Sequence, residues 1–150
     1  VYSLGAANIV DAMREHDVAR LVVVSSSATE PHNHADAGFL LNRVLQPLIS
    51  ATLGRTTYAD MRRMETLVRA SDLDWTILRP SGLFDLPEPT GYRLYENEAP
   101  GAFTARIDLA TCLLDEATDD RHVRTIQAVT TTAVTPSLWS LIRKEALKSA

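Results

Sequence analysis

The sequence predicts an α/β domain built on a parallel β-sheet, and two stretches carry this prediction. Residues 3–15 have the spacing of an amphipathic helix, and the apolar run Leu21–Val24 follows as a strand of the kind that is buried on both faces. The same order returns with a helix over 58–70 and a short apolar strand over 75–79. Helices that alternate with such strands are typical of doubly wound sheets, in which helices cover both faces.

A polar loop and a long apolar segment separate these two units. Residues 28–38 are rich in Pro, Asn, Asp and Gly and predict a loop. Residues 39–53 carry a wide apolar stripe and predict a helix, which Pro47 kinks or interrupts and Gly54 ends. We expect this helix to belong to the core or to a lid, with a dimer face as the third option.

The helix over 58–70 opens on a recognisable start signal. Thr57 and Asp60 have the Ser/Thr-x-x-acid spacing in which a hydroxyl and a carboxylate satisfy the free N–H groups of a first turn. The helical period then divides the side chains between the core and solvent. We expect Met61, Met64, Leu67 and Val68 to be buried, and Arg62, Arg63, Glu65 and Arg69 to be exposed.

Shorter patterns predict the remaining elements. Residues 92–95 favour a short strand or hairpin, residues 124–131 alternate as a strand, and Thr135-Pro136 opens a last helix. Thr104 is expected to cap a helix over 105–117. The inward side chains of that helix are expected to be Leu109, Ala110, Leu113 and Leu114. With 150 residues and no internal repeat, the chain is predicted to form one domain, 1–150.

Composition argues against several classes of partner. A net charge of −4 without a basic stripe argues against nucleic acid and anionic membranes. No apolar run approaches the roughly 20 residues of a membrane span. We therefore expect a cytoplasmic protein that acts on a small molecule, and a homodimer is one option for its assembly.

Metal and thiol chemistry are not expected. The single cysteine, Cys112, lies in an apolar helical pattern, so neither a disulfide framework nor a cysteine metal site is available. His32 and His34 sit in the polar loop, where solvated side chains are commoner than metal ligands. A serine nucleophile is disfavoured because no G-x-S-x-G motif is present. An acidic cluster near residue 117 is expected to be a solvated surface, and it consists of Asp115, Glu116, Asp119 and Asp120.

The residues that follow the strand over 75–79 are the first candidates for a ligand site. Pro80 cannot donate to a β-ladder, so the strand stops there or lies at an edge. Gly82 leaves room for the close approach of a ligand or of another backbone. Because open parallel sheets bind ligands outside the carboxyl ends of their strands, Pro80, Ser81 and Gly82 fall where a ligand would sit.

Three serines, Ser25, Ser26 and Ser27, follow the other apolar strand. A hydroxyl at the carboxyl end of a parallel strand can hydrogen-bond a substrate carbonyl and help to polarise it during hydride addition. Alternatively, the serines only end the strand and bond to loop backbone. The local sequence weighs the two readings equally.

Tyr58 and Arg62 are spaced i and i+4 and so share one face of the predicted helix. In a hydride-transfer site a tyrosine can act as general acid, and a cation four residues on can lower its pKa and hold ribose hydroxyls. The simpler alternative is a tyrosine that packs on Met61 and an arginine that is solvated. The sequence alone favours this simpler alternative.

No phosphate-binding loop can be written from the glycines of this chain. They stand at positions 5, 38, 54, 82, 91 and 101, and neither G-x-G-x-x-G nor G-x-x-G-x-x-G fits them. Nothing in the sequence is therefore expected to cradle a pyrophosphate.

Three blocks of the sequence resemble the atypical short-chain dehydrogenase/reductase group. They are VYSLGAANIVDAM…VARLVVVSSS, YADMRRMETLVRASDLDWTILRPSGLFD…TGYRL and ARIDLA, and together they span most of the chain up to Thr131. Within that group the chain looks most like NAD(P)H-binding proteins of the flavin-reductase (biliverdin reductase B-like) and NmrA-like type. The segment SDLDWTILRP is the most specific part of the match, whereas LVVVSSS is common.

The resemblance implies the C-terminal part of a Rossmann-type doubly wound parallel sheet that binds NADP or NAD. The Gly-rich phosphate loop would then precede this chain, so the domain is expected to be truncated at its N-terminus. By position, Ser26, with Ser25 and Ser27 beside it, matches a serine near the nicotinamide. Pro80, Ser81, Gly82 and Leu83 match the segment that lines the nicotinamide side.

Two positions depart from the family pattern. Members with a Tyr-x-x-x-Lys pair carry lysine where this chain has Met61 or Arg62, which puts the role of Tyr58 in question. The serine that is usual in the block SRADLA is Ala105 here.

Two functions follow from the resemblance. The first is an NAD(P)H-dependent oxidoreductase that transfers hydride to a small conjugated or flavin-like acceptor, with Ser26 and Tyr58 as catalytic residues and Arg62 among the cofactor-binding ones. The second is a non-catalytic NmrA-like protein that senses NAD(P) and regulates a partner. The missing lysine favours the sensor, and the serine-rich strand end favours the enzyme. Of the two, we expect the enzyme.

If the first strands are missing, the sheet edge would be open to pairing with another chain, and this chain alone would bind no cofactor tightly.

Overall fold

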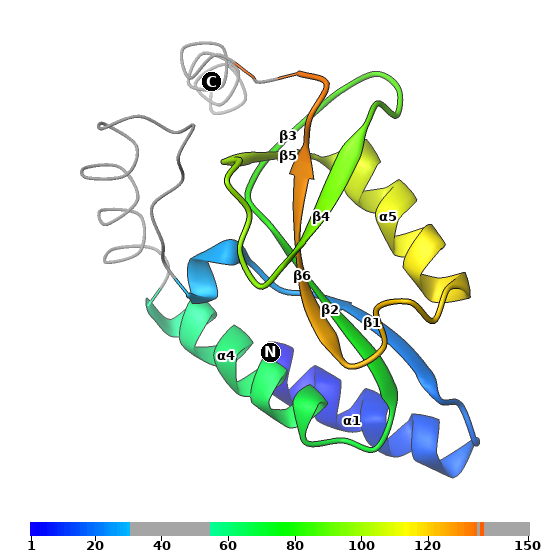
Figure 1. Cartoon of the computed structure of the whole chain (residues 1–150). Coiled ribbons are helices and arrows are strands. Elements are labelled where there is room, and N and C mark those ends of the chain that lie inside the picture. Colours follow the sequence, from blue (N-terminus) through cyan, green and yellow to red (C-terminus); the bar gives the residue numbers. More distant parts are fainter. Residues whose placement is uncertain (31–54, 135, 137–150) are drawn as a thin grey trace.

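The computed structural model describes residues 1–30, 55–134 and 136 of the chain. Within them, a four-stranded sheet has helices on both faces, and a separate pair of short strands lies beyond one end of it (Figure 1). Three predictions lie outside the described residues: the helix over 39–53, the solvated side chains of His32 and His34, and the last helix, of which only Pro136 is described.

The described elements follow the predicted order. They are α1 (Tyr2–Glu15), β1 (Arg20–Val24), the 3₁₀ turn η1 (Ser27–Thr29), α4 (Arg55–Arg69), β2 (Asp74–Pro80), β3 (Gly82–Phe84), β4 (Tyr92–Glu96), β5 (Phe103–Ala105), α5 (Arg106–Thr118) and β6 (Thr125–Thr131). The sequence missed β3 and β5, because three residues are too few to show a period.

The main sheet has the strand order β1-β2-β6-β4. β2 pairs in parallel with β1 on one side and with β6 on the other, whereas β4 pairs antiparallel with β6. α4 lies between β1 and β2 in the chain, and α5 precedes β6, so the parallel strands are joined through helices. The mixed α/β architecture with a mainly parallel sheet is therefore confirmed.

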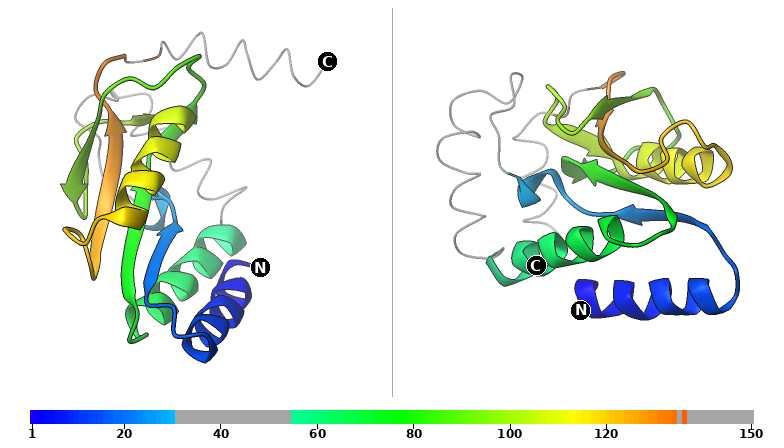
Figure 2. Two further views of the ribbon diagram at one scale, coloured as in Figure 1. Left: turned by 90° about the vertical axis from the view of Figure 1, so that its right-hand side faces the viewer. Right: turned by 60° about the horizontal axis from the view of Figure 1, so that its bottom comes forward.

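The continuously apolar sequence of β1 is explained by burial on both faces. Leu21 and Val23 pack into the cluster that includes α1 and α4, whereas Val22 and Val24 pack into the cluster that includes α5. The two views of Figure 2 show α1 and α4 together on one side of the sheet and α5 on the other. Ile77, at the centre of β2, is fully buried, which stabilises the fold by about 1.5–3 kcal/mol.

A carboxylate joins α1 to α4. Asp60 of α4 accepts hydrogen bonds from the backbone N–H groups of Tyr2 (2.7 Å) and Ser3 (3.4 Å) and from the Ser3 hydroxyl (2.5 Å). These bonds satisfy donors of the first turn of α1 that have no partner within the helix. The prediction that Thr57 and Asp60 start their own helix is wrong, since α4 already begins at Arg55.

α5 begins without the cap that the sequence predicted. Its N-cap residue is Ala105, which makes no side-chain cap bond. Thr104 donates its hydroxyl hydrogen to the Val129 carbonyl of β6 at 2.6 Å instead, so a tertiary partner replaces the local one. The prediction failed because a capping pattern cannot reveal a competing acceptor that is 25 residues away.

The buried face of α5 is only partly the predicted one. Leu109 is buried and Leu113 is half-buried, but Ala110 is exposed and Leu114 is 72% exposed. The residues of α5 that are buried are Asp108, Leu109, Cys112 and Glu116. Three of these four follow one another at i+4 spacing, so the helix turns an acidic residue inward at each end of that row.

Glu116 corrects the expectation that the acidic cluster is a solvated surface. Its carboxylate is buried, with Oε1 2.7 Å from His122 Nδ1 and Oε2 3.6 Å from Arg20 Nη2. Arg20 also donates from Nε to the backbone carbonyl of Glu116 at 3.0 Å and so fastens the end of α5 to β1. Asp115 and Asp120 are exposed, as the sequence predicted.

Two further observations concern the described residues as a whole. No helix among them combines the length and the apolar character needed to cross a membrane. No three of their His, Cys, Asp or Glu side chains are grouped so that they could hold a metal ion.

Two glycines give a matched test of the packing. A Cβ atom at Gly101 would collide with the Cγ2 methyl group of Thr130, whereas a Cβ atom at Gly5 in α1 would meet nothing within 4 Å. Gly101→Ala is expected to lower the free energy of unfolding by about 1–3 kcal/mol. Gly5→Ala is expected to raise it by about 0.5–1 kcal/mol. Urea denaturation measures both, and equal effects of the same sign would contradict this packing.

Candidate functional site

The two serine-bearing segments meet at the carboxyl ends of neighbouring strands. Val24 at the end of β1 is in register with Leu78 of β2, and the N–H group of Ser25 donates to the Leu78 carbonyl at 2.8 Å. A pocket of about 430 Å³ opens at this point. Its walls come from the start of α1, the end of β1, the first turns of α4 and the segment after β2. The lining residues are Tyr2, Val24, Ser25, Ser26, Thr57, Tyr58, Met61, Pro80, Ser81 and Leu83.

The pocket brings together six of the nine residues predicted for the site, and three lie outside its lining. Those in the lining are Ser25, Ser26, Tyr58, Pro80, Ser81 and Leu83. Those outside are Ser27, Arg62 and Gly82. The candidates that follow β1 and those at the end of β2 stand more than 50 residues apart in the sequence. The parallel pairing of β1 with β2 brings them together.

The three serine hydroxyl groups of the pocket differ in what they already bind. Ser25 Oγ is buried and has no hydrogen-bond partner among the described residues. Ser26 Oγ accepts the N–H group of Ala28 at 3.2 Å, which leaves its own hydrogen free to donate. Ser81 Oγ donates to the carbonyl of Gly101 at 3.2 Å. Among the three serines, Ser25 and Ser26 are therefore the ones whose hydroxyls can serve a ligand.

Arg62 and Gly82 have structural partners. Arg62 Nη1 donates to the backbone carbonyl of Thr29 at 2.8 Å, so this side chain holds η1 against α4. A Cβ atom at Gly82 would lie 3.2 Å from both the Ala102 carbonyl oxygen and Phe103 Cδ1. Of the two explanations for this glycine, the structure supports the approach of another backbone, in the β3–β5 pair.

Four residues of the lining were missed by the sequence analysis. Thr57 and Met61 come from the same turns of α4 as Tyr58, and Val24 is the last residue of β1. Tyr2 comes from the start of α1 and is 41% exposed. Its place in the pocket depends on how α1 packs against α4, for which the local sequence carries no signal.

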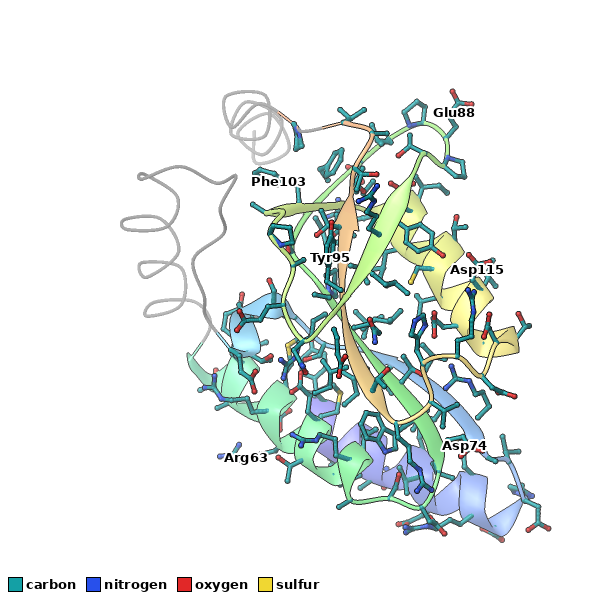
Figure 3. The ribbon with its side chains drawn as sticks, in the orientation of Figure 1. Arg63, Asp74, Glu88, Tyr95, Phe103 and Asp115 are labelled. Carbon is teal, nitrogen blue, oxygen red and sulfur yellow. The ribbon has the colours of Figure 1, made fainter. Side chains whose placement is uncertain are left out.

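A buried ion pair lies behind the pocket. Arg79, one residue before Pro80, donates from Nε to Glu65 Oε1 at 3.0 Å and from Nη2 to Glu65 Oε2 at 2.6 Å. The two side chains are 2% and 6% exposed. The prediction that Glu65 faces solvent is wrong, because Arg79 of β2 supplies a partner that the period of α4 cannot reveal. Arg63 does lie on the outer side of α4, as predicted (Figure 3).

A third nitrogen of Arg79 bonds to Glu30, the C-cap residue of η1. Arg79 Nη1 donates to Glu30 Oε2 at 2.9 Å. Burial works to lower the pKa of the Arg79 guanidinium, but the hydrogen bonds that Arg79 donates to Glu65 and Glu30 outweigh it and raise that pKa. The arginine is therefore charged throughout the physiological range and holds two carboxylates from two elements.

The chemistry of the pocket is that of a neutral, partly apolar ligand site. None of its ten lining residues carries a charged side chain. Its volume is toward the lower end of the range of about 300–1,000 Å³ that is usual for small-molecule sites. A buried hydroxyl without a partner is costly unless a ligand or water supplies one, so Ser25 marks where a polar atom belongs.

Comparison with protein families identifies the domain. The family model described as NAD(P)H-binding matches residues 3–120. This chain belongs to the NAD(P)H-binding family. The matched span runs from the first turn of α1 to just past the end of α5 and includes every residue of the pocket lining except Tyr2.

Two curated proteins share sequence with part of the chain. A UPF0659 protein of Schizosaccharomyces pombe is 34% identical over 87 residues, which are 54% of this chain and 34% of that protein. An uncharacterized chloroplastic protein of Arabidopsis thaliana is 36% identical over 98 residues, which are 65% of this chain and 32% of that protein. The alignments thus span about a third of the length of these relatives.

Solved structures share the fold. A short-chain dehydrogenase/reductase of Veillonella parvula, determined in complex with NADP, superposes with a TM-score of 0.71 at 24% identity, covering 91% of this chain and 63% of that one. ChuY of Escherichia coli O157:H7, an anaerobilin reductase, superposes with a TM-score of 0.67 at 20% identity, covering 91% and 61%. These likenesses confirm the Rossmann-like fold.

The Arg79–Glu65 pair is expected to dominate the stability of the site. Arg79→Ala would leave the Glu65 carboxylate buried without its partner and should lower the free energy of unfolding by about 3–5 kcal/mol. Arg106→Ala removes an exposed pair with Asp85 and should cost at most about 1 kcal/mol. Urea denaturation distinguishes the two, and a loss at Arg79 no larger than that at Arg106 would contradict the account.

The single cysteine is expected to be inert in the folded protein. Cys112 is fully buried, and burial, with a smaller contribution from Glu116, raises the pKa of its thiol to about 12. Since the thiolate is the reactive form, iodoacetamide at pH 8 should leave the native protein unmodified and alkylate it fully in urea. Mass spectrometry measures the modification, and rapid labelling of the native protein would show that the packing of α5 against the sheet does not cover this residue.

Proposed function

We propose that this chain carries the nicotinamide-binding side of an NAD(P)H-dependent oxidoreductase, which transfers hydride to a small conjugated or flavin-like acceptor. The observation that carries the proposal is the pocket at the carboxyl ends of β1 and β2, with the buried and unpartnered hydroxyl of Ser25 in its wall. This is where open parallel sheets bind their ligands, and the domain belongs to an NAD(P)H-binding family.

The lining residues fit the nicotinamide end of the cofactor. The nicotinamide carries a carboxamide, which is neutral and both donates and accepts hydrogen bonds, and the lining is neutral and offers serine hydroxyls. Ser25 supplies a buried hydroxyl for it, and Pro80 and Leu83 supply apolar contact. We assign Ser25, Pro80, Ser81 and Leu83 to cofactor binding and leave the choice between NAD and NADP open.

Ser26 and Tyr58 are the residues that we assign to the reaction. When bound, the reduced nicotinamide supplies a hydride, that is, one proton with two electrons. The Ser26 hydroxyl can donate its hydrogen to a carbonyl or ring nitrogen of the acceptor and so polarise it. Tyr58 can give the reduced acceptor the proton it then needs and take one back from water.

A second candidate is a non-catalytic NmrA-like protein that senses NAD(P) and regulates a partner. Two observations favour it. No lysine or arginine is among the described residues that line the pocket beside Tyr58, and Arg62 is already bonded to the Thr29 carbonyl. A tyrosine without a neighbouring cation is a weaker general acid, whereas nucleotide binding needs no such group.

The proposal extends to the setting in which the protein works. We assign it to the cytoplasm, with a small molecule as substrate and neither nucleic acid nor membrane as partner. A homodimer is one option for its assembly, and analytical ultracentrifugation would test it.

Binding and turnover separate the two candidates. NADPH and NADH are titrated by fluorescence into this chain and into the protein expressed from its natural start codon, and reduced-nucleotide oxidation is then followed at 340 nm with flavins and quinones. Binding with turnover supports the oxidoreductase, and binding without turnover supports the sensor. If neither form binds either nucleotide, both candidates fail.

Ser25→Ala is expected to weaken NADPH binding about five- to tenfold, because a hydrogen bond from a buried hydroxyl is lost. The matched control is Ser71→Ala, since Ser71 lies in the turn after α4 and donates to the Val68 carbonyl. That control should leave the dissociation constant within about twofold of the wild type. Isothermal titration calorimetry measures both, and equal dissociation constants for Ser25→Ala and the wild type would remove Ser25 from the site.

A further inference from the structure

The Ser26 backbone is held by one residue of the turn that follows it, Thr29. Thr29 is 2% exposed, and its N–H group and its hydroxyl both point to the Ser26 carbonyl, at 3.1 Å and 2.7 Å. Ser26 is also the N-cap residue of η1, in an extended conformation. Two donors on one carbonyl fix the plane of that peptide and, with it, the direction in which the Ser26 side chain leaves the backbone.

The same hydroxyl connects this turn to the buried ion pair. Thr29 Oγ1 lies 3.2 Å from Glu65 Oε1, so its one hydrogen is shared between the Ser26 carbonyl and this carboxylate oxygen, which also accepts from Arg79 Nε. Arg62 holds the opposite side of the turn through the Thr29 carbonyl, at 2.8 Å. Thr29 therefore connects Ser26, which lines the pocket, to the Glu65 carboxylate. Arg79 fixes that carboxylate by hydrogen bonds to both of its oxygens.

From this chain of contacts we infer that Thr29 and Glu65 are positioning residues for Ser26, with Arg79 as the anchor. The inference rests on the proposed function, because it concerns residues that support the lining of the proposed nicotinamide pocket. None of these three side chains lines the pocket. They act by fixing the turn in which the serine hydroxyl is aimed at the ligand, since a hydroxyl misdirected by a free turn makes a weaker hydrogen bond.

Two substitutions at one position separate positioning from bulk stability. Thr29→Val keeps the shape and removes the hydroxyl, whereas Thr29→Ser keeps the hydroxyl and removes a methyl group. The control is Thr66→Val, which removes a comparable hydroxyl from the exposed side of α4, where it donates to the Arg62 carbonyl. Thermal unfolding of each variant confirms that the fold is intact before ligands are compared.

The ligand measurement uses the protein expressed from its natural start codon, with NADPH and with ADP-ribose as probes. ADP-ribose lacks the nicotinamide, so a defect confined to the Ser26 side of the pocket spares it. Thr29→Val is expected to weaken NADPH binding about five- to tenfold and to leave ADP-ribose binding within about twofold of the wild type. Thr29→Ser and Thr66→Val are expected to bind both probes like the wild type.

A second readout is independent of any ligand. The Ala28 amide is bonded to Ser26 Oγ, so amide hydrogen exchange at this position reports the serine's orientation in the free protein. Exchange there should be faster in Thr29→Val than in the wild type and unchanged in Thr29→Ser. Unchanged exchange in Thr29→Val, or an equal loss of affinity for NADPH and ADP-ribose, overturns the inference. If the wild type binds neither NADPH nor NADH, the proposed function fails, and the exchange measurement still decides the positioning role.

Discussion

The bidentate pair between Arg79 and Glu65 is the interaction on which the site depends. It joins α4 to β2 one residue before the strand ends at Pro80, and both side chains are almost fully buried. Burying two charges is costly, and here the cost is offset by short, doubled hydrogen bonds and by a third bond from Arg79 to Glu30. Because Glu65 also meets Thr29, the pair fixes the segment after β1 as well as the end of β2.

The fold places this charged anchor beneath a neutral pocket. The apolar clusters on the two faces of the sheet bring β1 and β2 side by side, so the segments that follow them meet at one end. The pocket at that end offers hydroxyl and apolar groups, whereas the charged side chains of Arg79 and Glu65 are paired with each other and do not line it. Such a site suits a neutral ring with a few polar atoms, which is the basis for proposing the reduced nicotinamide as its occupant.

Much of the architecture could be predicted from the sequence, because its signals are local. Each of these signals lies within a short stretch of sequence: the continuous apolar run of β1, the periods of the helices and the end of β2 at Pro80. The structure confirms all three. Glu65 is different: its period on α4 indicated solvent, and only the arrival of Arg79 from another element explains its burial. The capping predictions for Asp60 and Thr104 failed for the same reason, since each side chain bonds to a distant element instead of capping a helix of its own segment. Tyr2 was missed because it reaches the pocket only through the packing of α1 against α4.

The central claim is that the pocket between Ser25 and Ser81 holds the nicotinamide. The most direct test is a crystal structure, with NADP bound, of the protein expressed from its natural start codon. We expect an ordered nicotinamide ring in this pocket, with its carboxamide within hydrogen-bond distance of the Ser25 or Ser26 hydroxyl. An ordered nicotinamide seated elsewhere, with the Ser25 hydroxyl still unpartnered, would contradict the account.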